Sequence, residues 1–438
     1  MSRSRLALDA AVQSAGEVLA RRGARYEVFA RLGQTTVVTR EADGEWRRGT
    51  TREVGVGCRV AAGGRAGFAA AAGSGARAGR DAAQAAIEAM VSDADPLPPR
   101  GVLGTAPAPP PAAVIDLEAQ ESFARELAAR LDRARADLRL ARVRTLAGAS
   151  TTTLVTGEGF RARADASGAV VELLVAPERG PWRHFHFAAR EFAALDLDAL
   201  ARRAVDATLL TMAGPGAPHA LADVLLAPAV AAPLVVALAQ ELVRPRDDAA
   251  APLRAARVSR AWRLTDQRAG PGGLLPLPCD GEGLPSAGLE LVGAGRIGPP
   301  HTSWADAQRT GATAGGAVRP SYRHPPATGP ANLVVTGALG ASQARLLERL
   351  GDGFYLAVPA GPVRVEPGRL AFALRTAAVA IRRGRPVAAH PLVELRGSIR
   401  RLLAGLEAAG DDGEAFSLAC AVTTPSLLFR RLGIASLA

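Results

Sequence analysis

Residues 23–71 read GARYEVFARLGQTTVVTREADGEWRRGTTREVGVGCRVAAGGRAGFAAA, and this stretch predicts an antiparallel meander of strands. Two runs, YEVFA at 26–30 and TTVVT at 35–39, have the β-branched and aromatic composition of strands. In VGVGCRV (54–60) alternation places one set of apolar side chains on a single face: Val54, Val56, Cys58 and Val60. Gly63-Gly64 is typical of a two-residue hairpin turn.

Two helical patterns flank the meander. Residues 8–22 form an amphipathic pattern whose apolar side carries Leu8, Val12, Ala15 and Leu19. An alanine-rich helix is predicted from Asp81 to about Val91. A proline-rich stretch at about 96–114 then predicts an extended connector. The opening block is therefore predicted to be an α+β unit.

The rest of the first half predicts more strands and two helices. Strand patterns lie at 159–165 and 169–175, separated by a DASG turn, and at 182–187. Helices are predicted at roughly 116–136 and from an N-cap at Asp196 to about Met212. GPGAPH at 214–219 predicts a domain boundary. Residues 1–215 are thus expected to form an N-terminal α+β domain with helices packed on a mainly antiparallel sheet.

Residues 216–438 are predicted to form a β-rich, barrel-like antiparallel domain with a few helices. Strand patterns recur through this half, at 223–228, 288–298, 332–337, 354–358 and 426–429. Hairpin turns are expected at EPGR (366–369) and RRGRP (382–386). The predicted helices are 229–242, 342–350 and roughly 395–408.

Composition limits the classes of function. The chain has 438 residues and a formal net charge of +11, and every basic residue is arginine. The absence of lysine indicates a codon bias, so the charge is a weak argument for nucleic acid, and 4% aromatic residues disfavour single-strand stacking. Three cysteines far apart suit a reducing compartment. No signal peptide or membrane span is recognisable, so we expect a cytoplasmic protein.

Familiar catalytic motifs are absent or incomplete. Gly293, Gly295 and Gly298 spell G-x-G-x-x-G, but Pro299-Pro300 follow at once and cannot supply the backbone donors of a dinucleotide site. His184 and His186 share one face of a strand, which gives either half of a metal site or the polar side of a half-buried strand. Cys420 is either a nucleophile or a buried small hydrophobe.

Five collinear stretches carry a resemblance to a known family. They are the hairpin with Gly55, Gly57, Arg59, Val60, Gly67, Phe68 and Ala69, then DVLLAPAVAAPLVVALAQELV (223–243), GLPSAGLELVGAGRIG (283–298), SYRHPP with ANLVVTG (321–337), and the run 347–403. In this order they resemble the TldD/PmbA (TldD/TldE) metallopeptidase family from end to end.

The resemblance also shows what this chain lacks. Catalytic members carry H-E-x-x-x-H on the helix after a V-L-x-x-P strand, where two histidines bind zinc and the glutamate activates water. In the matching window of this chain, Val236 stands in place of the first His, Ala237 in place of the Glu, and Glu241 in place of the second His. Gln240 occupies the position just before Glu241. No histidine occurs between His219 and His301. The resemblance therefore implies no catalytic residue and no metal in this chain.

The resemblance places the chain in the PmbA/TldE-like, non-catalytic branch, whose short T-P-S-L-L ending it shares at 424–428. Cys420, four residues before that ending, is accordingly not assigned as a metal ligand. Such subunits pair with a TldD-like paralogue that bears H-E-x-x-x-H and the zinc, and the pair cuts unstructured peptides. Tyr322, Arg323 and His324 are candidates for the peptide channel by their family motif, with a packed turn as the alternative.

Two other functions remain open from the sequence. One is a divergent, self-sufficient metallopeptidase that recruits His184, His186 and Cys420 as ligands. The other is a regulatory protein, similar to a gyrase modulator, that contacts nucleic acid or a protein partner; its affinity for nucleic acid would fall steeply with salt. The peptide substrate, the cleavage site and the choice between homodimer and heterodimer are not readable from the residues.

Overall fold

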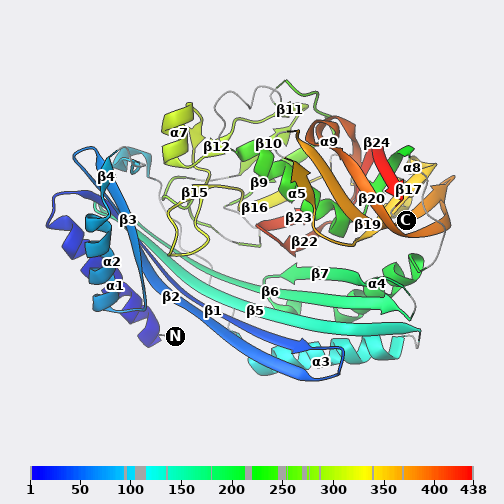
Figure 1. Ribbon diagram of the computed structural model, residues 1–438, viewed down its shortest axis with the longest axis horizontal. Helices are drawn as coiled ribbons and strands as arrows, with labels where there is room; N and C mark the ends of the chain where they lie inside the picture. The colour runs from blue at the N-terminus through cyan, green and yellow to red at the C-terminus, as the bar shows by residue number, and fades with distance from the viewer. Residues whose placement is uncertain are drawn as a thin grey trace.

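The computed structural model describes most of the chain, namely residues 2–92, 96–103, 115–134, 137–178, 180–212, 220–244, 253, 255–268, 274–275, 277–285, 288–337, 340–366 and 369–436. A long curved sheet from the first half lies beneath a β-rich second half, and helices cover the outer side of the curved sheet (Figure 1). The expected α+β architecture is confirmed.

The curved sheet has seven antiparallel strands in the order β4-β3-β2-β1-β5-β6-β7. Their bounds are β1 (Arg25–Arg40), β2 (Trp46–Ala62), β3 (Arg65–Ala72), β4 (Val91–Ser92), β5 (Leu138–Thr156), β6 (Arg161–Pro177) and β7 (Arg183–Ala189). The hairpin between β2 and β3 turns at Gly63 and Gly64, both with positive φ, as the sequence predicts.

Two predictions in this sheet are wrong. The runs at 26–30 and 35–39 belong to one strand, β1. The DASG turn at 165–168 does not exist, because β6 passes straight through it and pairs with β5. Asp165 lies opposite Thr151 of β5 and accepts a hydrogen bond from the Thr151 hydroxyl. A residue that is common in turns therefore forms a cross-strand pair here.

Within the described part of the first half, four helices pack on the outer face of the curved sheet in two pairs. The helices are α1 (Ser2–Ala20), α2 (Ala76–Glu88), α3 (Leu117–Ala134) and α4 (Leu197–Leu210), and 3-10 turns lie at Arg100–Val102 and Phe192–Ala194. The pair α1 and α2 buries Val28, Val56 and Cys58 at one end of the sheet. The pair α3 and α4 packs on the other end. The Asp196 carboxylate accepts bonds from Asp198 N and Ala199 N at the start of α4, which confirms the predicted N-cap.

The second half contains a small closed barrel. Its ring is β17-β8-β24-β20-β19, closed by the pairing of β19 with β17. The bounds are β8 (Ala220–Leu226), β17 (Gly353–Pro359), β18 (Arg364–Glu366), β19 (Ala371–Arg382), β20 (Arg385–Ser398), β21 (Leu406–Ala409) and β24 (Leu427–Ser436), where β18 and β21 pair at its margins. The pairing of β8 with β17 is parallel and the others in the ring are antiparallel.

A six-stranded sheet adjoins the barrel, in the order β11-β10-β9-β16-β23-β22. Its strands are β9 (Arg263–Asp266), β10 (Leu289–Gly293), β11 (Arg296–Ile297), β16 (Asn332–Val335), β22 (Glu414–Ser417) and β23 (Ala421–Thr424). Two-residue strands complete this half: β12 (His301–Thr302), β13 (Thr313–Ala314), β14 (Ala317–Val318) and β15 (Ala327–Thr328). The glycine-rich stretch 293–298 contains β11 and the tight turn at Ala294 and Gly295 that joins it to β10.

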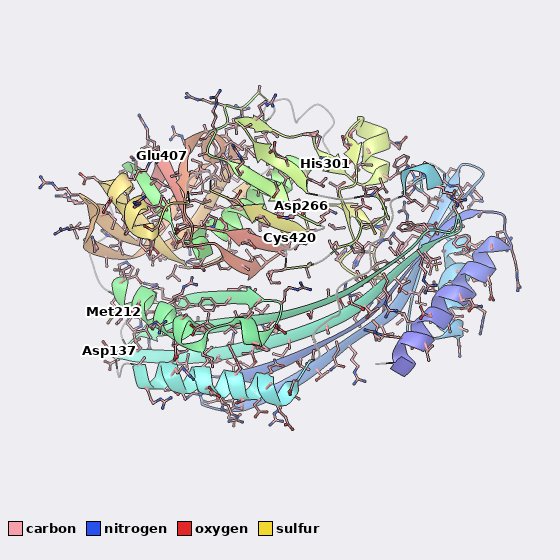
Figure 2. The ribbon with its side chains drawn as sticks, turned by 180° about the vertical axis from the view of Figure 1, so that it is seen from behind. Asp137, Met212, Asp266, His301, Glu407 and Cys420 are labelled. Carbon is pink, nitrogen blue, oxygen red and sulfur yellow. The ribbon has the colours of Figure 1, made fainter. Side chains whose placement is uncertain are left out.

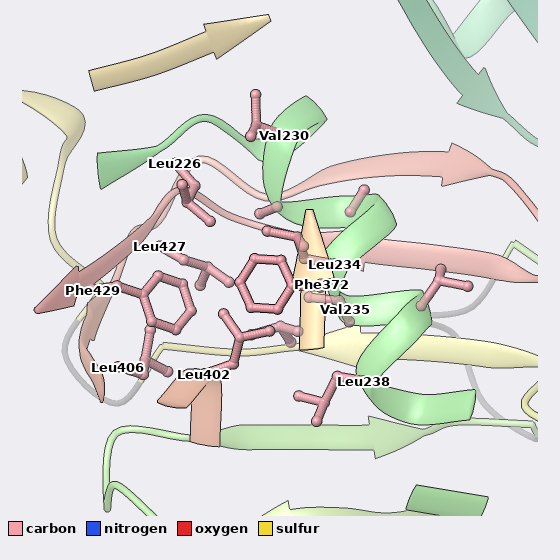
Figure 3. Packing of buried hydrophobic residues seen from close by; sticks show 14 of the residues in the cluster. Leu226, Val230, Leu234, Val235, Leu238, Phe372, Leu402, Leu406, Leu427 and Phe429 are labelled. Atoms are coloured by element: carbon pink, nitrogen blue, oxygen red, sulfur yellow. The ribbon is translucent and has the colours of Figure 1, made fainter. Parts of the chain in front are cut away.

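The helices that the structure describes in this half are α5 (Pro228–Val243), α7 (Trp304–Thr310), α8 (Gln343–Leu350) and α9 (Ile399–Gly405). The predicted helix at 395–408 is too long at both ends, because β20 continues to Ser398 and β21 begins at Leu406. Figure 3 shows Leu234 and Val235 of α5 beside Phe372, in the core that joins helix and barrel.

The predicted segment boundaries lie mostly outside the described residues. GPGAPH and all but 96–103 of the proline-rich connector fall there. In the described part of the connector Leu97 is buried, and its carbonyl accepts a bond from Arg25 Nη2 at 2.8 Å. No helix among the described residues combines the length and the apolar character needed to cross a membrane.

Candidate functional site

Helix α5 carries the window 236–241, where the family resemblance implies the metal ligands of catalytic members. It follows β8 directly and starts at Pro228, whose missing N–H costs nothing at the first helical position. Val236 and Ala237 point into the protein, with 6% and 4% exposure. Gln240 is exposed at the last turn, whereas Glu241 is buried and pairs with Arg244 at 2.9 Å.

These residues do not fit a zinc ion. Val236 and Ala237 offer no lone pair to a metal and no group that could move a proton. The remaining carboxylate, Glu241, already has a guanidinium as its partner. Across the described residues, no three His, Cys, Asp or Glu side chains gather as metal ligands would.

A cavity of about 780 Å³ lies at the end of α5, between the curved sheet and the second half of the chain. Helix α5 contributes Gln240, Val243 and Arg244 to its wall. The inner face of the curved sheet contributes a set of paired positions, Phe29, Arg31, Thr152, Leu154, Ala162 and Ala164. The segments 277–281, 317–320 and 328–331, with Leu275, Ala419 and Cys420, form most of the remaining wall.

Cys420 lines this cavity and lies on the side of the second half that faces the curved sheet (Figure 2). Burial, with a smaller contribution from Asp266, raises the pKa of its thiol to about 12, against the opposing effect of Arg268. The group is therefore a neutral thiol near neutral pH. A neutral thiol is a poor nucleophile.

His184 and His186 do lie on one face of a strand, β7. His184 is exposed, and His186 Nε2 accepts a bond from Ser417 N at 3.2 Å while its ring stacks near Phe416. Burial lowers the pKa of His186 despite the nearby Glu172. His186 thus joins β7 to β22, and the described residues do not assemble His184, His186 and Cys420 into a three-ligand site.

Tyr322 of the SYRHPP stretch is buried, with 2% exposure, against the inner face of β2. A Cβ on Gly55 would lie 2.6 Å from Tyr322 Cδ2 and closer still to two other ring atoms, and a Cβ on Gly57 would meet the Tyr322 carbonyl oxygen within 3.0 Å. Because Gly55 and Gly57 of the family hairpin have no side chains, they leave the space that Tyr322 occupies. Glycine inside a strand is the signal for such an approach.

Arg323 and His324 follow Tyr322 on the surface. Arg323 Nε donates to Tyr322 Oη at 3.1 Å, and His324 N donates to Ser321 O in a turn. Both side chains are exposed to solvent, whereas Tyr322 is enclosed. A contact of these three residues with peptide stays a prediction.

The sequence did not predict a buried charge cluster between the two halves. Arg59 of β2 lies 3.3 Å from Glu27 and 2.9 Å from Glu282, and Arg319 also pairs with Glu27. All four side chains are at most 7% exposed. Burial raises the pKa of Glu282 to about 7, although Arg59 opposes the rise. Arg59 belongs to the hairpin that carries the family resemblance. Its partners lie too far away along the chain for these contacts to be predicted from the sequence.

Comparison with known proteins adds a family and a fold. Residues 222–436 match the family model described as PmbA/TldA metallopeptidase C-terminal domain. No curated protein matches the chain.

Three solved structures share the fold over 98% of this chain. The crystal structure of TldE from Thermococcus kodakarensis matches with a TM-score of 0.85 at 16% identity, over 100% of its own length. A proposed modulator of a DNA gyrase from Thermotoga maritima matches at 0.81 and 14%, over 100% of its length. A similar protein from Bacteroides thetaiotaomicron matches at 0.77 and 14%, over 99% of its length. The fold is thus that of TldE.

Proposed function

We propose that this chain, which belongs to the TldD/PmbA family through its C-terminal domain, is a PmbA/TldE-like partner subunit that has no zinc site of its own. The observation that supports this most strongly is helix α5, where Val236 and Ala237 are buried aliphatic residues and Glu241 is tied to Arg244. A helix with this surface can pack against a core, but it cannot hold a metal ion or activate water.

The active partner is a TldD-like paralogue that carries H-E-x-x-x-H and supplies the zinc. The paired subunits enclose a chamber that admits unstructured peptides and excludes folded proteins by size. A peptide held as an added strand is bound through its main chain, so affinity tolerates many sequences. This chain contributes part of the chamber wall, and its place of action is the cytoplasm.

The test uses the full chain produced alone and together with an H-E-x-x-x-H paralogue. We expect a stable complex on size-exclusion chromatography, and zinc-dependent cleavage of an unstructured peptide by the complex only. Replacing the first histidine of the paralogue's motif by alanine abolishes cleavage, whereas Val236→Ala in this chain leaves the rate of the complex within about twofold. Robust zinc-dependent cleavage by this chain alone would overturn the proposal.

A further inference from the structure

The cavity beside α5 has an uneven distribution of charge. Among the described residues its wall includes Arg31, Arg244, Arg319 and a single acidic residue, Asp280. Arg163 also borders the cavity, but it alternates with Ala162 and Ala164 on β6, and its Nε faces Asp165 at 3.8 Å. The side chain of Arg163 is therefore directed to the outer face of the sheet.

The acidic residue does not offset the arginines within the cavity. Asp280 is 4% exposed, and its carboxylate accepts hydrogen bonds from the backbone N–H groups of Glu282, Leu284 and Ala317 at 2.8–3.1 Å. Its oxygens are thus directed at the backbone of its own loop and of β14. Burial raises its pKa, against the lowering effect of these three backbone hydrogen bonds and of Arg268.

Arg319 is also occupied by other contacts. Its guanidinium lies over the Phe29 ring, 5.0 Å from the centroid, and it pairs with Glu27 and with the carbonyl of Gly281. The side chain is 2% exposed. Arg319 therefore forms a closed part of the wall, and Arg31 and Arg244 remain as the accessible cations among the wall residues that the structure describes.

Arg31 and Arg244 are held in similar ways from opposite sides of the cavity. Arg31 Nε lies 2.9 Å from Glu53 Oε2 but outside hydrogen-bond geometry, and Arg244 Nη2 lies 2.9 Å from Glu241 Oε1. Their side chains are 26% and 45% exposed, and neither carboxylate belongs to the cavity wall. A guanidinium has five N–H donors, so one carboxylate orients each side chain and leaves donors for a ligand.

Much of the remaining wall is apolar. The inner face of the sheet contributes Phe29, Leu154 and Ala162, and the other side contributes Val243, Leu277 and Val318. The volume lies in the range of about 300–1,000 Å³ that small-ligand sites occupy. A ligand with an apolar body and an anionic group complements this surface, whereas a nucleic acid would require an open basic groove with stacking residues.

We propose that this cavity binds an extended apolar peptide segment whose carboxylate is held by Arg31 and Arg244. The inference rests on the proposed function, and it assigns to the zinc-free subunit the task of holding an acidic group of the peptide while the partner's zinc cuts elsewhere. The carboxylate has two possible sources in a peptide, the C-terminus and a Glu or Asp side chain.

Binding to the full chain alone tests this proposal. Fluorescence anisotropy compares one labelled, unstructured apolar peptide in three forms: with a free C-terminal carboxylate, with a C-terminal amide, and as the amide with one internal glutamate. We expect the plain amide to bind at least about tenfold more weakly than the free acid, because a hydrogen bond to a charged group is lost. Recovery of affinity by the internal glutamate identifies a side-chain carboxylate as sufficient.

Variants locate the site. Arg31→Gln and Arg244→Gln each weaken binding of the acid about tenfold or more and reduce the difference between acid and amide. Arg77→Gln, on an arginine that is 89% exposed on α2, is the matched control and leaves binding unchanged. Thermal melts establish that the variants fold, and the acid–amide comparison needs no variant.

Equal affinity of the unaltered chain for the acid and the plain amide overturns the inference. Undiminished binding by both Gln variants overturns it as well. Because no cleavage is measured, the result is separable from the proposed function: peptide binding without activity of the paired subunits counts against the latter only, and activity without carboxylate-dependent binding counts against this inference only.

Discussion

Alanine at Gly55 or Gly57 is expected to force Tyr322 from its position between the two halves of the molecule. Ordinary carbon contacts begin near 3.4 Å, yet a Cβ on Gly55 would lie 2.6 Å from Tyr322 Cδ2 and one on Gly57 would lie within 3.0 Å of the Tyr322 carbonyl oxygen. Overpacking of this kind costs about 1–3 kcal/mol. Neither glycine has a positive φ, so the cost arises from the collision and not from backbone strain.

The two positions differ in which part of Tyr322 they meet. The atoms nearest to a Cβ on Gly55 all belong to the ring, whereas those nearest to a Cβ on Gly57 include the Tyr322 backbone. Tyr322→Ala alone is expected to cost about 3–5 kcal/mol, as for other buried aromatic residues. In its presence Gly55→Ala costs close to nothing, while Gly57→Ala keeps most of its cost.

Urea denaturation followed by tryptophan fluorescence provides the assay. A double-mutant cycle for each glycine with Tyr322→Ala yields the coupling energy. Gly49→Ala, where a Cβ meets nothing within 4 Å, is the control and leaves the unfolding free energy unchanged or slightly raises it. Wild-type stability of Gly57→Ala, or equal relief of both glycine variants by Tyr322→Ala, would refute the packing argument.

Three further outcomes are expected. Burial raises the pKa of Glu282 to about 7, so the contribution of this group to stability is complete below its unfolded pKa and is lost as pH rises through about 7. Glu282→Gln should therefore remove a slope of up to about 1.4 kcal/mol per pH unit from the pH dependence of the unfolding free energy. An unchanged slope in pH-dependent denaturation would contradict this. Cys58, Cys279 and Cys420 each have a pKa raised to about 12 by burial, so iodoacetamide at neutral pH should label the folded chain far more slowly than the unfolded chain, and rapid labelling of Cys420 would disprove its neutral state. Asp196→Ala should lower the unfolding free energy by about 1 kcal/mol through loss of the α4 cap, which Asp196→Asn, as the conservative variant, should largely retain.

Local patterns predicted most elements but not their lengths. Asp196 was recognised as a cap because a cap depends on neighbours within one turn. The strand β1 was divided into two because Gly33 and Gln34 interrupt its apolar run. In the structure Gly33 and Gln34 pair with β2 and with β5, which keeps them within the strand. This pairing with neighbouring strands cannot be predicted from the residues of β1 alone.

Long-range contacts were beyond prediction for the same reason. Closure of the barrel needs the parallel pairing of β8 with β17, whose residues are more than a hundred positions apart. The contact of Tyr322 with Gly55, and that of Arg59 with Glu282, likewise join distant segments. The residue types in the window 236–241 were known from the sequence itself, whereas the burial of Val236 and Ala237 and the pairing of Glu241 with Arg244 came from the structure.

The zinc content of the isolated, full-length chain tests the central claim most directly. After expression with added zinc and removal of loosely bound metal by gel filtration, inductively coupled plasma mass spectrometry gives the molar ratio of zinc to protein. The buried Val236 and Ala237 and the paired Glu241 predict a ratio near zero for this chain, and near one for its complex with an H-E-x-x-x-H paralogue. A ratio near one for the chain alone would contradict the account.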